Sequence, residues 1–160
     1  MEKLPQTDFQ ELAESITKAS QKIIQNYFEN STGYAHDNRD ITSTFNAFGS
    51  KIVADSAEMQ KVQDVYNTFL QSQQELWKRI TQRQFDKTKE YEPLILPDKN
   101  DKRFRAPEWD EAPYYFDFVK QSYLLVSKMM KDIIENAGIS DTEKKKLNFY
   151  SRQYIDAFSP

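Results

Sequence analysis

The sequence contains no cysteine, and this absence excludes a large set of chemistries. Without a thiol the chain can form no disulfide bond and can supply no cysteine nucleophile. Glycine is nearly as scarce, because Gly33, Gly49 and Gly138 are the only three and stand far apart. A phosphate-binding loop and a nucleophile elbow both need closely spaced glycines, so the sequence has neither motif.

Histidine is limited to one residue, His36, in the polar stretch GYAHDNRD. A metal site needs several converging ligands and a serine triad needs a histidine base, so we interpret His36 as a surface residue and predict no metal site. The pair Asp110 and Glu111 is better explained as solvated charge or helix-start residues than as an acid–base pair. No cofactor is predicted, and the chain alone is not expected to be an enzyme.

Long apolar runs are also missing: none approaches a membrane span, and MEKLPQTDFQ has no signal core. We therefore expect a cytoplasmic protein with no transmembrane span. The 22 basic and 25 acidic residues are intermixed, with a net charge of −3, and give no basic patch for nucleic acid. Aromatic residues make up 14% of the 160 residues, which suits one domain with a modest core of large side chains.

Apolar spacing predicts an all-α, bundle-like domain. A first helix is expected to begin at Thr7, with Gln10 completing a capping box, and to end by Gly33. One face of this helix would carry Phe9, Leu12, Ile16, Ile23 and Tyr27. We assign residues 1–40 to this variable N-terminal helix and a loop, and residues 41–160 to the helical domain.

A heptad pattern follows, in two registers: Phe45, Ile52, Met59, Tyr66, Gln73 and Ile80, then Phe48, Asp55, Val62, Phe69, Leu76 and Arg83. Asp55 and Glu58 form a capping-box pattern, which predicts a break there and a long helix over 56–88. Two interpretations stay open. The seam packs inside a bundle, or the helix protrudes and pairs with a partner, an interpretation favoured by Gln73 and Arg83 in its distal half.

Four prolines, Pro93, Pro97, Pro107 and Pro113, forbid a continuous helix and predict a long irregular connection over about 91–113. Helical spacing resumes with Phe116, Val119, Tyr123, Val126, Met130, Ile133 and Ala137, and Gly138 is the expected C-cap. Ser140 and Glu143 form a capping box for a last helix. Its apolar stripe is Leu147, Tyr150, Tyr154 and Phe158.

Two motifs, DKRFRAPEWDEAPYYFDFVKQSYLL and SRQYIDAFSP, resemble the N-terminal region of polyhydroxyalkanoate synthases, the poly(3-hydroxybutyrate) polymerases, of the single-subunit class I type. The first motif matches at Asp101, Arg103, Phe104, Pro107, Trp109, Pro113, Phe116, Asp117, Gln121, Ser122, Tyr123, Leu124 and Leu125. The second matches at Arg152, Gln153, Asp156, Ala157, Ser159 and Pro160. Ala112 departs from the common asparagine, and the resemblance is specific from about residue 91 onward.

The resemblance implies a non-catalytic N-terminal domain of such a synthase. In the family this region leads into an α/β-hydrolase catalytic domain that carries a cysteine nucleophile, a histidine and an aspartate, and that transfers 3-hydroxyacyl groups from coenzyme A. Its implied partners are that catalytic domain, a second copy in a homodimer, and phasin-type proteins or the surface of polymer granules. The alternative is a free-standing, phasin-like structural protein of the granule surface.

Eight residues are the candidate interaction and packing residues: Arg103, Phe104, Trp109, Tyr66, Phe69, Leu76, Trp77 and Tyr123. Phe104 and Trp109 on a proline-stiffened connection can pack across helix faces at low entropic cost. Arg103 is expected near Asp101 or Asp110. Two roles for the aromatic pair stay open, because they can fix the connection on their own bundle or reach a neighbouring domain.

Overall fold

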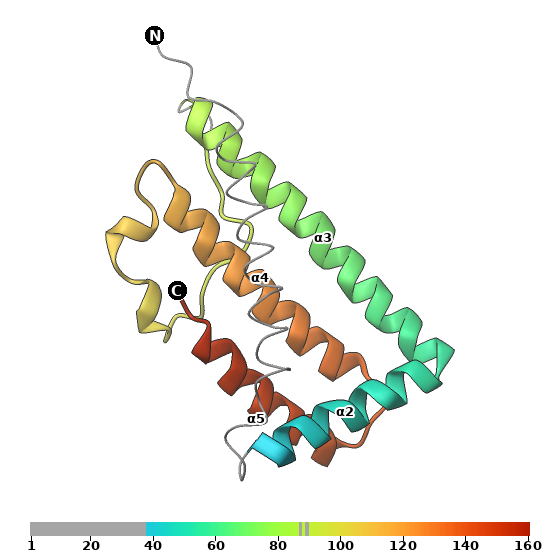
Figure 1. Ribbon diagram of the computed structural model, residues 1–160. Helices are drawn as coiled ribbons and strands as arrows, with labels where there is room; N and C mark the ends of the chain where they lie inside the picture. The colour runs from blue at the N-terminus through green and yellow to red at the C-terminus, as the bar shows by residue number, and fades with distance from the viewer. Residues whose placement is uncertain (1–37, 87, 89) are drawn as a thin grey trace. The chain divides into compact units, whose positions relative to one another are not determined.

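The computed structural model describes residues 38–86, 88 and 90–160, with side chains from residue 43 onward (Figure 1). The helix predicted from Thr7 and the histidine His36 lie outside the described residues. The domain boundary predicted at residue 40 stays a prediction. The chain divides into two units, Met1–Thr44 and Phe45–Pro160, and the second unit holds every contact reported below.

Four α-helices and two short 3-10 helices make up the regular structure of the described residues, which include no strand. They are α2 (Asn38–Ala54), α3 (Ser56–Phe85), η1 (Lys102–Phe104), η2 (Pro107–Trp109), α4 (Tyr115–Asn136) and α5 (Asp141–Ala157). The all-α prediction is confirmed. The irregular connection is confirmed too, and residues 91–113 are called the ribbon from here on.

The predicted helix break at Asp55 is confirmed. The Asp55 carboxylate accepts hydrogen bonds from the backbone N–H groups of Ala57 (2.8 Å) and Glu58 (3.4 Å), as an N-cap does. The other half of the predicted capping box is wrong. Glu58 instead pairs with Lys61 at 2.6 Å and accepts the Gly138 N–H at 2.8 Å, because that distant backbone offers a free donor.

Two helix boundaries, the end of α3 and the start of α2, differ from the predicted ones by a few residues. α3 stops at Phe85 and not near 88, since the Asp86 side chain accepts the Thr88 N–H at 3.1 Å and so favours a local turn over another helical turn. α2 begins at Asn38, inside the stretch expected to be a turn. Both differences lie at helix termini, where local hydrogen bonds compete most easily with the helix.

Gly138 has a role different from the predicted one. α4 ends with Ala137 as its C-cap at φ −69°, and no described glycine has a positive φ, so Gly138 is not a left-handed cap. A Cβ atom at position 138 would lie 2.8 Å from Glu58 Oε1. Glycine therefore allows the close approach of Glu58. The predicted box of Ser140 and Glu143 at the start of α5 is confirmed, with both reciprocal bonds present.

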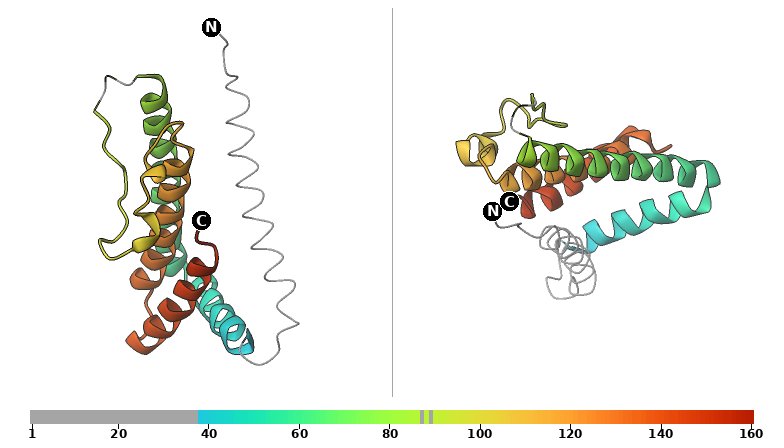
Figure 2. Two further views of the ribbon diagram at one scale, coloured as in Figure 1. Left: turned by 90° about the vertical axis from the view of Figure 1, so that its left-hand side faces the viewer. Right: turned by 90° about the horizontal axis from the view of Figure 1, so that it is seen from above.

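The helices α3 and α4 run antiparallel and side by side, as both figures show (Figures 1 and 2). Leu76 and Ile80 of α3 and Leu125 of α4 form the buried core between them, at 0%, 2% and 6% exposure. α5 runs back along α4, and Leu147 is its buried apolar residue at 2% exposure. Tyr91, Leu94, Ile95, Phe69, Tyr114 and Phe118 pack around the core.

The most deeply buried face of α4 is partly polar. Asp117 and Gln121 are 0% exposed and Lys120 is 3% exposed. Phe116 and Val126, two members of the predicted apolar stripe, are 50% and 38% exposed. α4 thus forms where the spacing predicts it. Its most deeply buried residues include polar ones, whose partners lie on α3 and the ribbon.

Candidate functional site

Arg103 of the ribbon ties three segments together, and we call Arg103, Asp101, Tyr123 and Asp156 the Arg103 clamp. Its Nε and Nη2 atoms donate to the two oxygens of Asp101 at 2.9 and 2.8 Å. Its Nη1 atom donates to the Tyr123 hydroxyl of α4 at 2.8 Å and to Asp156 of α5 at 3.2 Å. One guanidinium therefore joins the ribbon to α4 and to the last turn of α5, beside which the ribbon lies in Figure 1.

Local sequence places this guanidinium. Asp101 caps the single-turn helix η1 by accepting the Arg103 N–H at 3.1 Å, so the cap and the ion pair use the same carboxylate. Hydrogen bonding to Arg103 lowers the pKa of Asp101, and the same bonds raise the pKa of Arg103. Both groups stay charged across the physiological range, as a bidentate pair favours.

Two of the ribbon's aromatic residues, Phe104 and Trp109, pack on α4. Phe104 is 6% exposed, with ring centroids 5.1 Å from Trp109 and 5.8 Å from Tyr123. Trp109 is half-buried, its Nε1 atom donates to the Arg103 carbonyl oxygen at 3.1 Å, and its ring meets Phe116 edge-on at 5.9 Å. Four of the predicted residues, Arg103, Phe104, Trp109 and Tyr123, therefore form one cluster.

The other four predicted residues lie on α3. Leu76 is in the core, and Trp77 packs edge-on against Phe118 at 5.9 Å. Phe69 is half-buried and lies 6.2 Å from Tyr66, which is 45% exposed. From Leu76 to Tyr66 these side chains become more exposed, and none of the four is part of the Arg103 clamp.

A second cluster, which the sequence did not reveal, is centred on Arg83; we call Arg83, Tyr91, Tyr114 and Asp117 the Arg83 cluster. Arg83 Nη1 donates to Asp117 Oδ2 at 2.9 Å, and the guanidinium carbon lies 4.0 Å from the ring centroids of both tyrosines. The Tyr91 hydroxyl donates to the same Asp117 oxygen at 2.6 Å. Burial and this carboxylate raise the pKa of Tyr91, which stays a proton donor.

Gln121 and Lys120 complete the buried polar face of α4. The Gln121 carbonyl oxygen accepts the N–H groups of Leu94 (2.7 Å) and Ile95 (3.3 Å), so this side chain binds the ribbon's backbone directly. Lys120 bridges Asp117 at 3.2 Å and Asp110 at 2.6 Å. Every one of these buried groups is paired, which is the condition under which charge is tolerated inside a protein.

Gln73 and Arg83 do not favour a partner surface on the distal half of α3, and the choice between the two interpretations of this helix stays a prediction. Gln73 accepts a hydrogen bond from Ser122 at 3.2 Å, and Arg83 pairs with the fully buried Asp117. Both residues thus contact α4 inside the same unit. The signal that could have indicated this is the spacing of Asp117, Lys120 and Gln121, which puts three polar side chains on one side of the first half of α4.

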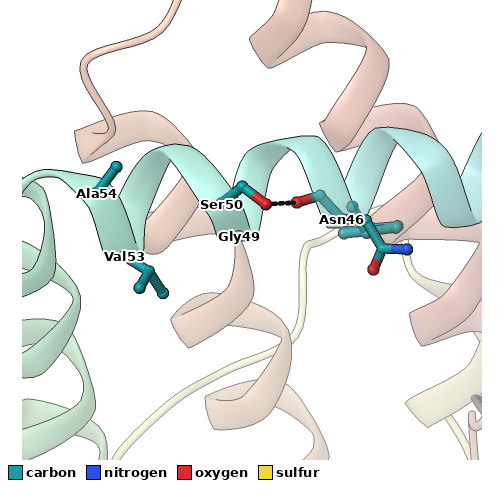
Figure 3. A pocket seen from close by; sticks show the side chains of 6 residues that line it. Asn46, Gly49, Ser50, Val53 and Ala54 are labelled. Atoms are coloured by element: carbon teal, nitrogen blue, oxygen red, sulfur yellow. Dashed lines mark hydrogen bonds between the residues drawn. The ribbon is translucent and has the colours of Figure 1, made fainter.

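A shallow hollow runs along α2 and is lined by Phe45, Asn46, Gly49, Ser50, Val53 and Ala54 (Figure 3). All the lining comes from one helix, and the Ser50 hydroxyl is already used, donating to the Asn46 carbonyl oxygen at 2.8 Å. Such a surface offers no converging polar groups for a small ligand. Among the described residues no cluster of acidic or histidine side chains is placed to hold a metal ion. In that part of the chain, no helix combines the length and apolar character that crossing a bilayer requires.

Comparison with known proteins gives one consistent answer. Residues 100–160 match the family model of the poly-beta-hydroxybutyrate polymerase (PhaC) N-terminus. A poly(3-hydroxyalkanoate) polymerase of Methylorubrum extorquens is 41% identical over 70 residues, or 43% of this chain and 11% of the relative. A poly(3-hydroxyalkanoate) polymerase subunit PhaC of Rhizobium meliloti is 36% identical over 87 residues, or 54% of this chain and 14% of the relative.

The match covers the ribbon's second half, α4 and α5, and so includes the whole Arg103 clamp. The matched region spans only 11% to 14% of the length of these relatives. No solved structure matches the chain. The resemblance noted from the two motifs is confirmed: residues 100–160 of this chain, which include both motifs, match the model of the poly-beta-hydroxybutyrate polymerase N-terminus.

Proposed function

We propose that this chain carries the N-terminal, non-catalytic region of a polyhydroxyalkanoate polymerase and that the region supports the catalytic part of that enzyme. The observation that carries the proposal is the Arg103 clamp, which fixes the last turn of α5 against the ribbon and α4. In the family the motif at the end of α5 leads into the catalytic domain. A fixed helix end gives the following segment a defined starting position and direction.

The chemistry assigned to the parent enzyme is acyl transfer from 3-hydroxyacyl-coenzyme A to a growing polyester. This chain supplies no cysteine for such a step, so its contribution is to assembly. We include in that contribution the pairing of two copies and attachment to granules or their coat proteins. Phe104 and Leu76 are buried, which favours an internal packing role for those two. Trp109 and Tyr66 are partly exposed, and their exposed surface can contact a partner.

A second candidate function is that of a phasin-like structural protein on the granule surface. Met59, Tyr66 and Leu70 are each 40% to 45% exposed and lie along one side of the first half of α3. An apolar helix side of this kind can lie on a polymer surface without spanning anything. This is the observation that favours the second candidate.

The primary function is tested by exchanging the matched N-terminal segment of the Methylorubrum extorquens polymerase for this chain and measuring polymer made in cells. The exchanged enzyme should be active, and Arg103→Ala should lower its rate about tenfold, because a displaced support misaligns distant reacting groups. Arg105→Ala is the matched control, since Arg105 donates only to the Lys99 carbonyl oxygen at 3.3 Å. Equal activity of the Arg103 and Arg105 variants would contradict the proposal.

The second candidate is tested by sedimenting the purified chain with polymer granules that carry no polymerase. Co-sedimentation that is lost in Tyr66→Ser/Leu70→Ser would favour the granule-surface role. Phe149→Ser, which changes an exposed aromatic residue on α5, is the control. A chain that stays in the supernatant excludes the second candidate and leaves the first intact.

A further inference from the structure

The two ends of the ribbon meet at one side chain. Tyr91 is the first residue of the ribbon and Tyr114 is the residue after its last, and their rings lie on the Arg83 guanidinium at the same distance of 4.0 Å. Tyr114 has a left-handed backbone, with φ 62° and ψ 14°. A non-glycine residue adopts that conformation at a cost, so contacts of its side chain must offset the cost.

The hydrogen bonds of Arg83 also connect the two ends of the ribbon. Nη1 donates to Asp117, which also accepts from Tyr91 at the start of the ribbon, and Nη2 donates to the Asp110 carbonyl oxygen near its end at 3.2 Å. The Arg83 side chain is 21% exposed and Asp117 is 0% exposed. A single residue of α3 therefore contacts both ends of the ribbon and the helix that follows it.

We infer that Arg83 is a positioning residue that holds the two ends of the ribbon together, so that the ribbon behaves as one cooperative loop. The closed loop in turn holds the Arg103 clamp in place. The closure stands on the contacts of Arg83 alone. Only its consequence for the polymerase rests on the proposed function. The inference extends the site from residues 100–160 to α3, which the family model does not cover.

The geometry demands arginine and not merely a positive charge. A planar guanidinium can stack between two rings while its edge donates to two acceptors, and a lysine ammonium cannot do both. Lys120 already provides a second cation to Asp117 and Asp110. Arg83→Lys therefore preserves the net charge of the cluster and removes mainly the stacking and the forked hydrogen bonds.

Limited trypsin digestion of the full chain tests the closure, because Lys99, Lys102, Arg103 and Arg105 are cleavage sites within the ribbon. Arg83→Lys should speed cleavage in the ribbon about tenfold, since cleavage tracks the population of the open loop, while helix content stays unchanged. Arg79→Lys is the matched control. Arg79 lies one turn earlier and touches only the start of the ribbon, donating to Glu92 O at 3.1 Å, so the change should stay within about twofold. Equal effects of the two variants would overturn the inference.

Hydrogen exchange decides the matter if Arg83→Lys fails to fold. Tyr114→Leu removes one ring at the end of the ribbon and should speed exchange of the Leu94 amide at its beginning about fivefold or more. Phe116→Leu, an aromatic change two residues later that leaves the Arg83 cluster intact, should not. Leu94 exchange that ignores Tyr114 would show that the two ends open independently and would overturn the closure.

The exchanged polymerase separates this inference from the proposed function. If Arg83→Lys opens the ribbon but polymer synthesis is unchanged in both Arg83→Lys and Arg103→Ala, the closure stands and the supporting role fails. If Arg103→Ala lowers synthesis and Arg83→Lys leaves both the ribbon and synthesis unchanged, the supporting role stands and the closure fails. Loss of synthesis in both variants, with an open ribbon in Arg83→Lys, is the expected result.

Discussion

The two halves of α3 differ in which side chains they bury. In the first half, residues 56–70, Met59, Tyr66 and Leu70 are 40%, 45% and 40% exposed. In the second half, residues 71–85, an arginine reaches a fully buried carboxylate beside the core residues Leu76 and Ile80. The second half therefore has the core and a partly buried charge, and its exposed apolar side chain is Phe85 at the very end, at 76%.

The difference teaches that partners, as well as residue type, decide burial on this helix. Arg83 can enter the interior because Asp117 and two rings receive it. The first half has a polar contact at its beginning, where Glu58 accepts the Gly138 N–H, and Phe69 at its end packs against the core. Met59, Tyr66 and Leu70 in this half keep 40% to 45% of their surface exposed, which leaves apolar area for a partner.

The largest expected effect is a difference in stability loss between the same leucine-to-alanine substitution made in each half of α3. Leu76→Ala should lower the free energy of unfolding by about 4 kcal/mol, because it opens a cavity in a core position of 0% exposure. Leu70→Ala, the matched change on the first half, should cost less than about 1 kcal/mol. Urea denaturation measures both. Equal losses would mean that the first half is as enclosed as the second.

An intermediate effect is expected from Asp117→Asn, which leaves Arg83 and Lys120 in the interior without their carboxylate. The free energy of unfolding should fall by about 3 kcal/mol, as for other broken buried ion pairs. Asp64→Asn is the control on the first half, where Asp64 accepts an exposed hydrogen bond from Gln60 at 2.8 Å, and it should cost about 0.5 kcal/mol or less. A small loss in Asp117→Asn would mean that the buried cations are already satisfied by other groups.

The smallest effect concerns the exposed ion pair between Lys51 of α2 and Glu143 of α5. The Lys51 ammonium, followed by hydrogen bonds from Ser140, lowers the pKa of Glu143 from 4.5 to about 2. A lowered carboxyl pKa stabilises the fold above the unfolded value, so this contribution is complete above pH 4.5 and is lost as pH falls toward 2. Since the pair is exposed, the shift in thermal midpoint should be slight.

Glu143→Gln should flatten the dependence of the thermal midpoint on pH between 4.5 and 2. Glu111→Gln is the control, because no ion pair of Glu111 is found within the described residues. A wild-type pH dependence in Glu143→Gln would assign the acid sensitivity to other carboxylates.

Features governed by neighbouring residues were predictable from the sequence. Asp55 caps its own helix, and Ser140 and Glu143 satisfy each other three residues apart, so both helix starts were predicted correctly. The Arg83 cluster could not be predicted in the same way. Arg83 and Asp117 are 34 residues apart, and only the packing of two helices brings them together.

The candidate site was predictable in its members and not in its geometry. The motif resemblance drew attention to Arg103, Phe104, Trp109 and Tyr123, and the structure brings these four into one cluster. Asp156, matched in a separate motif, turned out to face the same guanidinium. Composition and spacing contain no information on which of several nearby carboxylates an arginine selects.

The attachments of the ribbon also join segments that are far apart in the sequence. Leu94 and Ile95 bind Gln121, and Tyr91 binds Asp117, so each bond joins the ribbon to a residue 26 or 27 positions later in the chain. α3 offers the ribbon contacts through Arg79 and Arg83, but the bonds to Asp117 and Gln121 form only once α4 is in place. The most motif-rich segment of this chain therefore gains its full set of contacts only when helices before and after it in the sequence have come together.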